Sequence, residues 1–315
     1  MMYRIGIDLG GTNIAAGLVN EKLELVSMVS VKTNAPRPLS SIIEDMAALV
    51  EKLLAENGLE RSDIASVGVG VPCTANEENG HMEDANNLGF DDEPFLGPLS
   101  EKLGLPVFFG NDANAAAWGE YLTGGYEEDS FLMVTIGTGI GGGIILNGKL
   151  WAGVNGAAAE FGHMTIAGSA APCSCGRTGC FEACAGAPAL AQQARERMAE
   201  DPDSVLWKLC GGDAEAVEAR HVFEGAASGD STSAALLERY TDLLAEGLTN
   251  IINIFQPACL CIGGGVSRAG DALLHPVRRK VGERLYSRNS KRNTTIILAK
   301  LDNDAGIIGA ALLGS

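Results

Sequence analysis

A histidine and three cysteines lie close together in the sequence. His163 is followed by Cys173, Cys175 and Cys180 within one short, glycine-rich stretch. One imidazole and three thiolates complete a tetrahedral zinc site, which leaves no ligand position for water and therefore has a structural role. The alternative is a group of buried cysteines beside an unrelated histidine, but the chain has only four histidines. These residues predict a structural Zn²⁺ site.

Two glutamates lie immediately beside the predicted zinc ligands. Glu160 comes shortly before His163, and Glu182 comes shortly after Cys180. A metal ion would fix the loop that carries both side chains. Carboxylates that are held in place in this way suit the binding of a ring of sugar hydroxyl groups. Cys184 is a further thiol, which we place in the core because it lies one turn into the next helix.

A second chemical motif is the glycine turn that follows the first apolar segment. The backbone N–H groups of such a turn can hold phosphate oxygens, and a threonine hydroxyl adds a donor. Asp8 cannot bind bare phosphate, because like charges repel, and is assigned to Mg²⁺ or its waters. The alternative is an ordinary hairpin turn. The residues assigned to phosphate here are Gly10, Gly11, Thr12 and Asn13.

The same template occurs again in the second half of the chain. Gly11-Thr12-x-Ile14-x-x-Gly17 matches Gly137-Thr138-x-Ile140-x-x-Gly143, and each copy lies between two apolar segments. The repeat predicts a duplication in which two hairpins face each other across a cleft. There is no G-x-x-x-x-G-K-[ST] motif, which excludes a P-loop enzyme. A third run, after another apolar segment, is expected to admit an adenine ring. The residues of these two elements are Gly137, Thr138, Gly139, Gly263, Gly264 and Gly265.

Asn111 and Asp112 lie where a predicted strand gives way to a helix. Taken alone, this pair favours helix capping, which Asn and Asp both do well. Phosphoryl transfer to a hydroxyl group, however, needs an acceptor for the proton that is lost. A carboxylate at the end of a strand, in a chain with phosphate-binding turns, is a natural base. Asp112 is therefore the candidate catalytic residue.

The elements that position these residues alternate along the chain. Strands and helices of these lengths predict an α/β fold. Ser41 and Glu44 predict a capping box for the first helix, and Gly58 predicts its end. Residues 73–95 are predicted to be a loop, and the polar residues 200–232 are assigned to no element. The predicted strands are 5–8, 14–19, 64–71, 106–109, 131–136, 143–146, 259–262 and 294–298, and the predicted helices are 41–57, 113–122, 181–199, 233–255, 270–285 and 305–315.

Composition excludes several classes of function. The formal net charge of −17 argues against a nucleic-acid-binding surface, which needs clustered Lys and Arg. No stretch resembles a membrane span, since the apolar run at residues 131–150 is interrupted by glycines. The N-terminal residues read directly into a strand without a leader-like segment, so we expect a cytoplasmic protein with reduced thiols.

These motifs together resemble those of the ROK family (repressors, open reading frames and kinases), and within it the bacterial ROK glucokinases. The resemblance covers essentially the whole chain, and the EFGH and CSCG elements together are highly specific for the family. The segments that carry it are DLGGT at 8–12, VGVGVP at 67–72, NLGF at 87–90, GNDAN at 110–114, TIGTGIGGGI at 135–144, EFGH at 160–163, CSCGRTGCFE at 173–182, GGGVSRAG at 263–270 and LDNDAGIIGAA at 301–311.

The resemblance implies a two-domain actin/hexokinase-like fold, a duplicated ribonuclease H-like fold with a cleft between the domains. The first domain is expected at 1–115, joined by a C-terminal helix at about 303–315. The second is expected at 116–302 and carries the zinc loop. A homodimer or a dimer of dimers is also expected.

The implied activity is that of an ATP- and Mg²⁺-dependent glucokinase of glycolysis, which transfers the γ-phosphate to the 6-hydroxyl group of glucose. By similarity, the catalytic base falls on Asp112 and the zinc ligands fall on His163, Cys173, Cys175 and Cys180. His163 would serve both zinc and sugar. The sugar contacts implied by the resemblance fall on Asn87, Asn111, Asp112, Glu160, His163 and Glu182.

Several alternatives stay open at this point. The substrate can be another hexose, such as N-acetylmannosamine, N-acetylglucosamine, fructose or allose, and the donor can be polyphosphate, although no basic track favours it. A sugar-responsive regulator would need an N-terminal DNA-binding domain, which the early first strand does not accommodate. Two departures from the family pattern matter. Asn13 replaces a basic residue of many relatives, and Cys73 lies in a loop where relatives often have Pro-Gly-Pro.

Overall fold

The protein divides into two compact units. The computed structural model describes residues 2–85, 87–166, 170–302 and 304–314. The first unit comprises Met1–Asp129, Gly143–Ala159 and Lys300–Ser315, and the second comprises Ser130–Gly142 and Glu160–Ala299. The expected domain boundary at residue 115 differs from this division, because it falls inside helix α3 (Asp112–Thr123). That helix stays whole in the first unit, where it packs against α10 (Asp304–Ala311).

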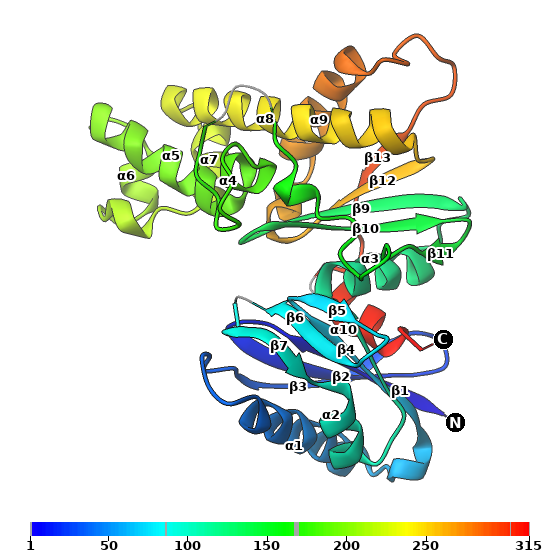
Figure 1. Ribbon diagram of the computed structural model, residues 1–315. Helices are drawn as coiled ribbons and strands as arrows, with labels where there is room; N and C mark the ends of the chain where they lie inside the picture. The colour runs from blue at the N-terminus through cyan, green and yellow to red at the C-terminus, as the bar shows by residue number, and fades with distance from the viewer. Residues whose placement is uncertain (1, 86, 167–169, 303, 315) are drawn as a thin grey trace. The chain divides into compact units, whose positions relative to one another are not determined.

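Two five-stranded sheets have equivalent orders of strands, and this agrees with the duplication that the sequence repeat predicted (Figure 1). In the first sheet the order is β3-β2-β1-β4-β8, with β1 antiparallel to β2 and parallel to β4. In the second the order is β11-β10-β9-β12-β13, with β12 parallel to both of its neighbours. The strands of the first sheet are β1 (Tyr3–Leu9), β2 (Asn13–Val19), β3 (Leu25–Lys32), β4 (Ile64–Val71) and β8 (Val107–Asn111), and those of the second are β9 (Ser130–Ile136), β10 (Ile140–Leu146), β11 (Lys149–Leu150), β12 (Cys259–Gly263) and β13 (Thr295–Leu298).

Alternation along β1 and β4 gives the first sheet two different faces. Ile5, Ile7 and Leu9 of β1 belong to the large core that also includes residues of α1 (Leu39–Asn57), whereas Gly6 of β1 and Gly68 of β4 face α10. A Cβ atom at Gly6 would lie 1.8 Å from the backbone oxygen of Ile307, and a Cβ atom at Gly68 would lie 1.7 Å from that of Ala310. Only glycine therefore allows α10 to lie so close to the sheet.

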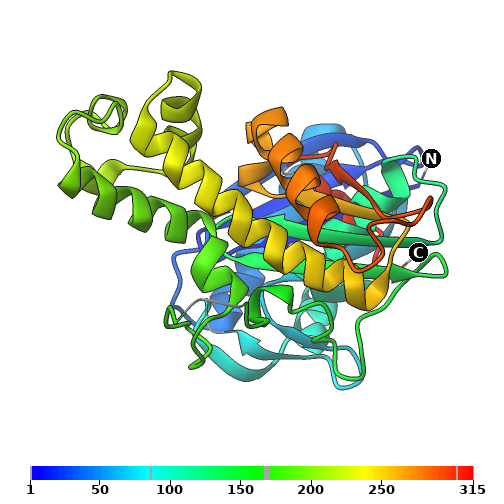
Figure 2. The ribbon, with the colours of Figure 1, turned by 90° about the horizontal axis from the view of Figure 1, so that it is seen from above.

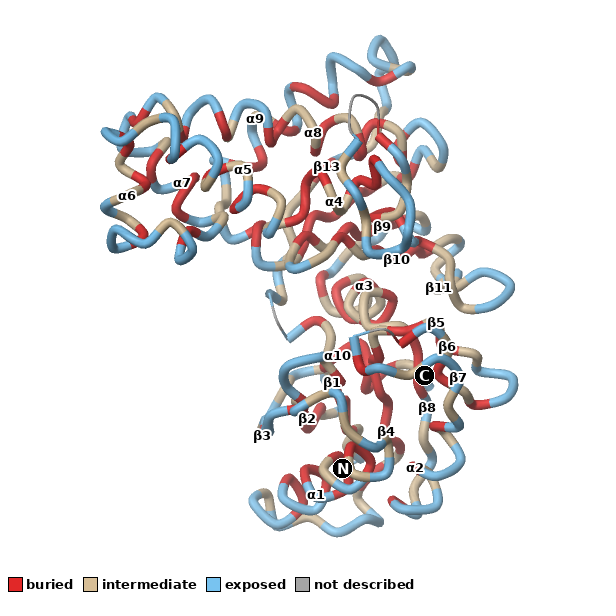
Figure 3. The backbone as a smooth tube through the Cα atoms, turned by 60° about the vertical axis from the view of Figure 1, so that its left-hand side comes forward, coloured by how far each residue is buried: buried red, intermediate tan, exposed pale blue. Residues whose placement is uncertain are grey.

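Helices of the second unit pack around one long helix. This is α8 (Ser231–Phe255), which contacts α4, α5, α7 and α9 and runs beside α9 in Figure 2. Burial is concentrated in the central strands β4, β9 and β12, and the red stretches of the tube at β4 and β9 can be followed in Figure 3. The other helices are α4 (Phe181–Ala185), α5 (Ala187–Glu200), α6 (Leu206–Leu209), α7 (Ala219–Ala227) and α9 (Asp271–Arg284).

The structure corrects the prediction of a loop at residues 73–95. A small sheet of order β5-β6-β7 occupies this segment, and α2 (Leu96–Leu103) follows it. Its strands are too short and too polar to give an apolar alternation, so composition alone suggested a loop. The strands are β5 (Thr74–Asn76), β6 (His81–Ala85) and β7 (Phe90–Pro94).

Helix boundaries also differ from the prediction. The capping box at Ser41 is wrong, because α1 begins earlier, at Leu39, with Pro38 as its N-cap. The predicted end at Gly58 is confirmed, since this glycine adopts a left-handed conformation with φ of 63°. The single helix expected at 181–199 is two helices, because Gly186 has an extended backbone between α4 and α5.

Candidate active site

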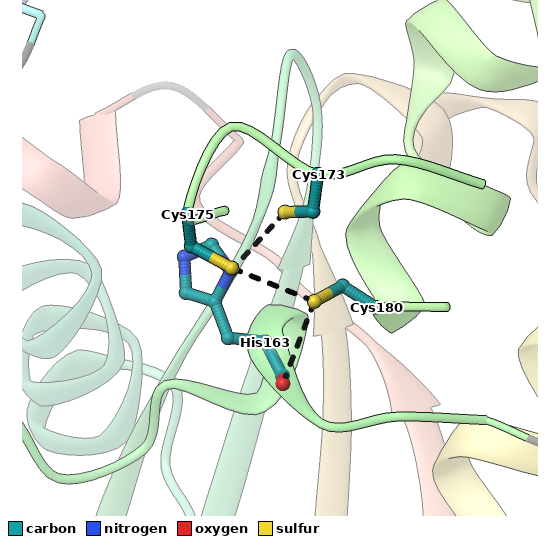
Figure 4. Close-up of side chains that lie close together, drawn as sticks. All are labelled: His163, Cys173, Cys175 and Cys180. Atoms are coloured by element: carbon teal, nitrogen blue, oxygen red, sulfur yellow. Dashed lines mark hydrogen bonds between the residues drawn. The ribbon is translucent and has the colours of Figure 1, made fainter. Parts of the chain in front are cut away.

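The predicted zinc ligands converge in the second unit. Their four ligand atoms all lie within 4.8 Å of one another (Figure 4). The Sγ atom of Cys173 lies 3.6 Å from Nδ1 of His163, and the Sγ atoms of Cys175 and Cys180 are 3.7 Å apart. Three sulfur atoms and one ring nitrogen in this arrangement match the donor set of a closed tetrahedral zinc site. The residues present therefore fit Zn²⁺.

Short elements bring these ligands together. His163 ends a single 3₁₀ turn, Cys180 is the N-cap of α4, and the N–H of Gly176 donates to the backbone oxygen of Cys173 at 3.0 Å. The guanidinium of Arg177 clamps the two legs of the loop, because it donates to the backbone oxygen of His163 at 3.0 Å and to Oγ1 of Thr165 at 2.9 Å.

The thiols of this cluster differ in their electrostatics. Burial, together with the neighbouring Cys175 and Cys173, raises the pKa of Cys180 to about 12. The pKa of Cys175 is lowered, first by a hydrogen bond from the backbone of Arg177. Thiolates are the ligand form of cysteine, so a cation at the centre would compensate for the buried charge at Cys180.

Glu160 lies beside this cluster. Its Oε2 atom is 3.9 Å from Nε2 of His163, the ring nitrogen that does not face the cysteines. Burial raises the pKa of Glu160, while His163 lowers it and Glu182 raises it further. Glu182, the other expected carboxylate, is in the first turn of α4, directly after Phe181 and close enough to Glu160 to affect its pKa.

A cavity of about 610 Å³ opens next to the second glycine turn. Gly137, Thr138 and Gly265 line it, together with residues of α5 and α7. Gly139, Gly263 and Gly264 are not among its lining residues. Gly264 instead has φ of 80° and packs on the backbone of Ile136, where a Cβ atom would approach the carbonyl oxygen to 2.5 Å. Gly264 and Gly139 therefore contribute to the shape of the turn through close packing and not by lining the cavity.

The first glycine turn borders a separate cavity of about 580 Å³ in the first unit. Asp8 and all four residues assigned to phosphate, 10–13, line it. The turn is tight, because the N–H of Gly10 donates to the backbone oxygen of Asn13 at 2.9 Å. Burial raises the pKa of Asp8. Asn87 is exposed, and its backbone oxygen lies near the position that a Cβ atom of Gly11 would take.

The structure separates the roles of Asn111 and Asp112. Asn111 is the N-cap of α3, and its Oδ1 atom accepts from the N–H groups of Ala113 and Asn114. Asp112 is the first helical residue, where its Oδ1 atom accepts from the N–H of Ala113 at 2.8 Å. Capping of α3 therefore falls on Asn111.

Sequence reasoning missed one wall of the larger cavity. Residues 217–220, together with Phe223 and Glu224 of α7, line it, and they come from the segment that had been assigned to no element. The helices of that segment are short and polar, so they leave no long periodic pattern. Asp304 beside the first glycine turn was also missed, although the LDNDAG motif contains it.

Known proteins are similar to this chain over nearly its whole length. The model of the ROK family matches residues 4–315. A glucokinase of Streptomyces coelicolor is 36% identical, with coverage of 99% of this chain and 97% of the relative. An N-acetylmannosamine kinase of Salmonella typhi is 31% identical, with coverage of 99% and 98%. A solved ROK glucokinase of Streptomyces griseus, in complex with glucose and AMPPNP, is 34% identical, with a TM-score of 0.86 and coverage of 99% and 98%.

The chain belongs to the ROK family, and it is a sugar kinase of that family. Its fold is the two-domain actin/hexokinase-like fold that the motifs implied. Among the residues that the structure describes, none of the helices combines the length and the apolar character needed to cross a lipid bilayer.

Proposed function

We propose that the protein transfers the γ-phosphoryl group of ATP to the 6-hydroxyl group of glucose. The observation that supports this most strongly is the similarity, over nearly the whole of both chains, to a glucokinase solved with glucose and AMPPNP. The reaction forms a bond between the sugar O6 and the γ-phosphorus, breaks the bond to the leaving ADP oxygen and releases the O6 proton. Such an enzyme would act in the cytoplasm at the start of glycolysis, as a homodimer.

Asp112 is proposed to receive the O6 proton. Because Asn111 already caps α3, the carboxylate of Asp112 is not required for that purpose. Its backbone lies over Gly70, where a Cβ atom would approach the Cα atom of Asp112 to 3.4 Å, so the end of β4 holds this residue in position. The proposed contacts to the sugar hydroxyl groups are Asn87, Asn111, Glu160, His163 and Glu182.

The glycine turns are proposed to bind the phosphates of ATP, and the cavity beside α7 is proposed to take the adenine. Its apolar residues Pro188, Val217 and Phe223 suit a flat aromatic ring. Asp8 is proposed to orient Mg²⁺, which would neutralise charge on the transferred group. The backbone amides of residues 11–13 are proposed to provide phosphate donors without net positive charge, which agrees with Asn13 in place of a basic residue.

The cysteine–histidine cluster is proposed to hold one structural Zn²⁺. When bound, the ion would stabilise the loop and offset the thiolate charges. The ligands of this chain would be His163 through Nδ1 and the three cysteines, which leaves Nε2 of His163 directed toward Glu160. His163 would then bind the metal ion through Nδ1 and present Nε2 to the sugar beside Glu160.

A second candidate substrate is N-acetylmannosamine. The relative from Salmonella typhi favours it. Nδ2 of Asn111 donates to the backbone oxygen of Cys73 at 3.2 Å, so the shape of this loop bears directly on a proposed sugar contact.

The test is a coupled assay of ADP formation by the purified protein with a panel of hexoses and amino sugars. We expect the highest kcat/KM with glucose and ATP, and little turnover with polyphosphate. Preference for N-acetylmannosamine would replace the proposed substrate, and absence of turnover with every sugar would overturn the proposal.

A further inference from the structure

Helix α4 joins the cysteine–histidine cluster to the second glycine turn. It begins at Phe181, directly after the cluster residue Cys180, and is followed at Ala187 by α5. Both ends of this short segment are hydrogen-bonded to the turn at residues 137–140. The cluster and the turn are far apart in the sequence but share one piece of rigid structure.

At the first end, the contact is made by the carboxylate of Glu182. Its Oε2 atom accepts from the backbone N–H of Ile140 at 2.9 Å. The preceding residue, Gly139, leaves space for this carboxylate, because a Cβ atom there would lie 2.3 Å from the same oxygen. Hydrogen bonds to an ionised acceptor are stronger than neutral ones. One oxygen of Glu182 is thus committed to the turn.

At the second end, the contact is made by backbone atoms. The N–H of Ala187 donates to the backbone oxygen of Gly137 at 3.0 Å, and the N–H of Gly186 donates to that of Glu182 at 2.8 Å. The turn is therefore fixed on both sides, at Gly137 and at Ile140. Between these points lies Thr138, which lines the larger cavity.

The segment that carries the histidine ligand also reaches this turn. A Cβ atom at Gly162 would lie 2.1 Å from the backbone oxygen of Ile140 and 3.3 Å from Cβ of Glu182. The residue next to His163 is therefore packed against the carbonyl oxygen of Ile140, the same residue whose N–H Glu182 binds. Two arms of the cluster, one with His163 and one with Cys180, converge on Ile140.

We propose that Glu182 is a positioning residue that fixes the glycine turn in its phosphate-binding shape and couples the cluster to nucleotide binding. The inference rests on the proposed function in one respect, which is that residues 137–139 bind phosphate. It adds a role for Glu182 that a sugar contact does not include. A sugar contact alone predicts no effect of Glu182 on the turn or on nucleotide binding in the absence of sugar.

Two measurements without sugar test this proposal. Hydrogen exchange of the peptide that contains residues 137–140 reports on the turn, and calorimetry with AMPPNP reports on nucleotide binding. In Glu182→Ala we expect faster exchange and a roughly tenfold or larger rise in the Kd for AMPPNP, the size expected for loss of a charged hydrogen bond. Glu182→Gln keeps an acceptor oxygen, so its exchange rate and its Kd for AMPPNP should lie between those of the wild-type protein and those of Glu182→Ala.

The matched control is Glu196→Ala, which removes an exposed glutamate of α5 that accepts from Gln192 in the same helix. It should leave exchange and AMPPNP binding unchanged. Cys173→Ser tests the link to the cluster and should also speed exchange at 137–140. Unchanged exchange in Cys173→Ser would overturn that link.

The outcomes separate this inference from the proposed function. Loss of glucose binding in Glu182→Ala, with normal exchange and normal AMPPNP affinity, would overturn the positioning role. If the wild-type protein fails to bind AMPPNP while Glu182→Ala still loosens the turn, the proposed nucleotide site is wrong and the positioning role is retained.

Discussion

The two glycine hairpins share a backbone template but differ in chemistry. When the two hairpins are aligned so that Gly11-Thr12 matches Gly137-Thr138, Asp8 of the first hairpin corresponds to Val134 of the second. Asp8 lines a cavity and has a raised pKa because of burial, whereas Val134 is completely buried in β9. The duplicated sheet provides the turn, and the residue at this position decides whether the turn also carries charge.

The other strand ends of the two sheets differ in the same way. In the first, β8 leads into Asn111 and Asp112 at the start of α3. In the second, β13 ends at Leu298, and the chain continues toward α10 without a carboxylate at that point. Both units thus carry a glycine turn, but the first adds acids at the ends of β1 and β8, while the second adds the loop with the cysteine–histidine cluster. Duplication supplied two equal frameworks, and their loops became specialised.

The largest expected effect is at Asp112, where the comparison predicts catalysis. Asp112→Asn should lower kcat by roughly 10²–10⁴-fold, the usual cost of losing a general base. Stability should change little, because Asn111 caps α3 and asparagine is tolerated at a helix start. Steady-state kinetics and thermal unfolding measure the two effects.

The control for Asp112→Asn is Asp271→Asn, which changes the first residue of α9 in the second unit. It should be silent in both measurements. A near-normal kcat in Asp112→Asn would show that Asp112 is not the general base.

The next largest effect concerns the cysteine–histidine cluster, which among the described residues is found in the second unit alone. Cys173→Ser should abolish binding of about one zinc per chain and destabilise the protein by ~2 kcal/mol or more, a fall in melting temperature of about 4–8 °C. Elemental analysis and calorimetry measure both. Cys184→Ala, a buried thiol outside the cluster, should keep the metal. A zinc-free wild-type protein would contradict the assignment.

The smallest effect concerns Asp8 and its counterpart Val134. Because burial raises the pKa of Asp8 above 3.8, the native state holds the proton to higher pH than the unfolded state. Stability therefore falls as pH rises through the raised pKa and stays lower above it. Asp8→Asn removes this cost and should stabilise the protein at pH 7.5 by about 0.5–1 kcal/mol, while turnover falls.

The stability gain in Asp8→Asn should shrink at pH 4.5, where more of the wild-type carboxyl is protonated. Melting temperatures of both proteins at the two pH values test this. A gain that is equal at both would exclude the buried charge as its cause, and Asp271→Asn serves again as an exposed control.

Much of the fold was predictable from the sequence because its signals are local. The strands at 64–71 and 259–262, the helix around 233–255 and the repeated glycine template are confirmed by β4, β12, α8 and the identical sheet orders. Apolar periodicity and glycine turns depend on neighbouring residues, so one sequence is enough to recognise them. Convergence of the cysteine–histidine set was predictable for the same reason, since three of its four ligands lie in one short loop.

Other elements were not predictable, because their residues acquire meaning only through distant contacts. The edge strand β3 has too weak an alternation of apolar and polar residues to be recognised in the sequence, since most of its residues are at least partly exposed. The wall that α7 gives to the larger cavity comes from a short polar helix. Such segments are stabilised by packing against the rest of the unit, and local propensity says little about them.

The amino-acid sequence by itself determined which residues can do chemistry here: the acids at strand ends, the glycine turns and the metal ligands. Tertiary structure alone decided which distant residues these side chains contact. It placed Asp112 over Gly70 and brought Glu182 onto the N–H of Ile140. The physical reason is that a hydrogen bond or a close backbone approach between residues far apart in the chain depends on how the elements pack, and no local pattern encodes that distance.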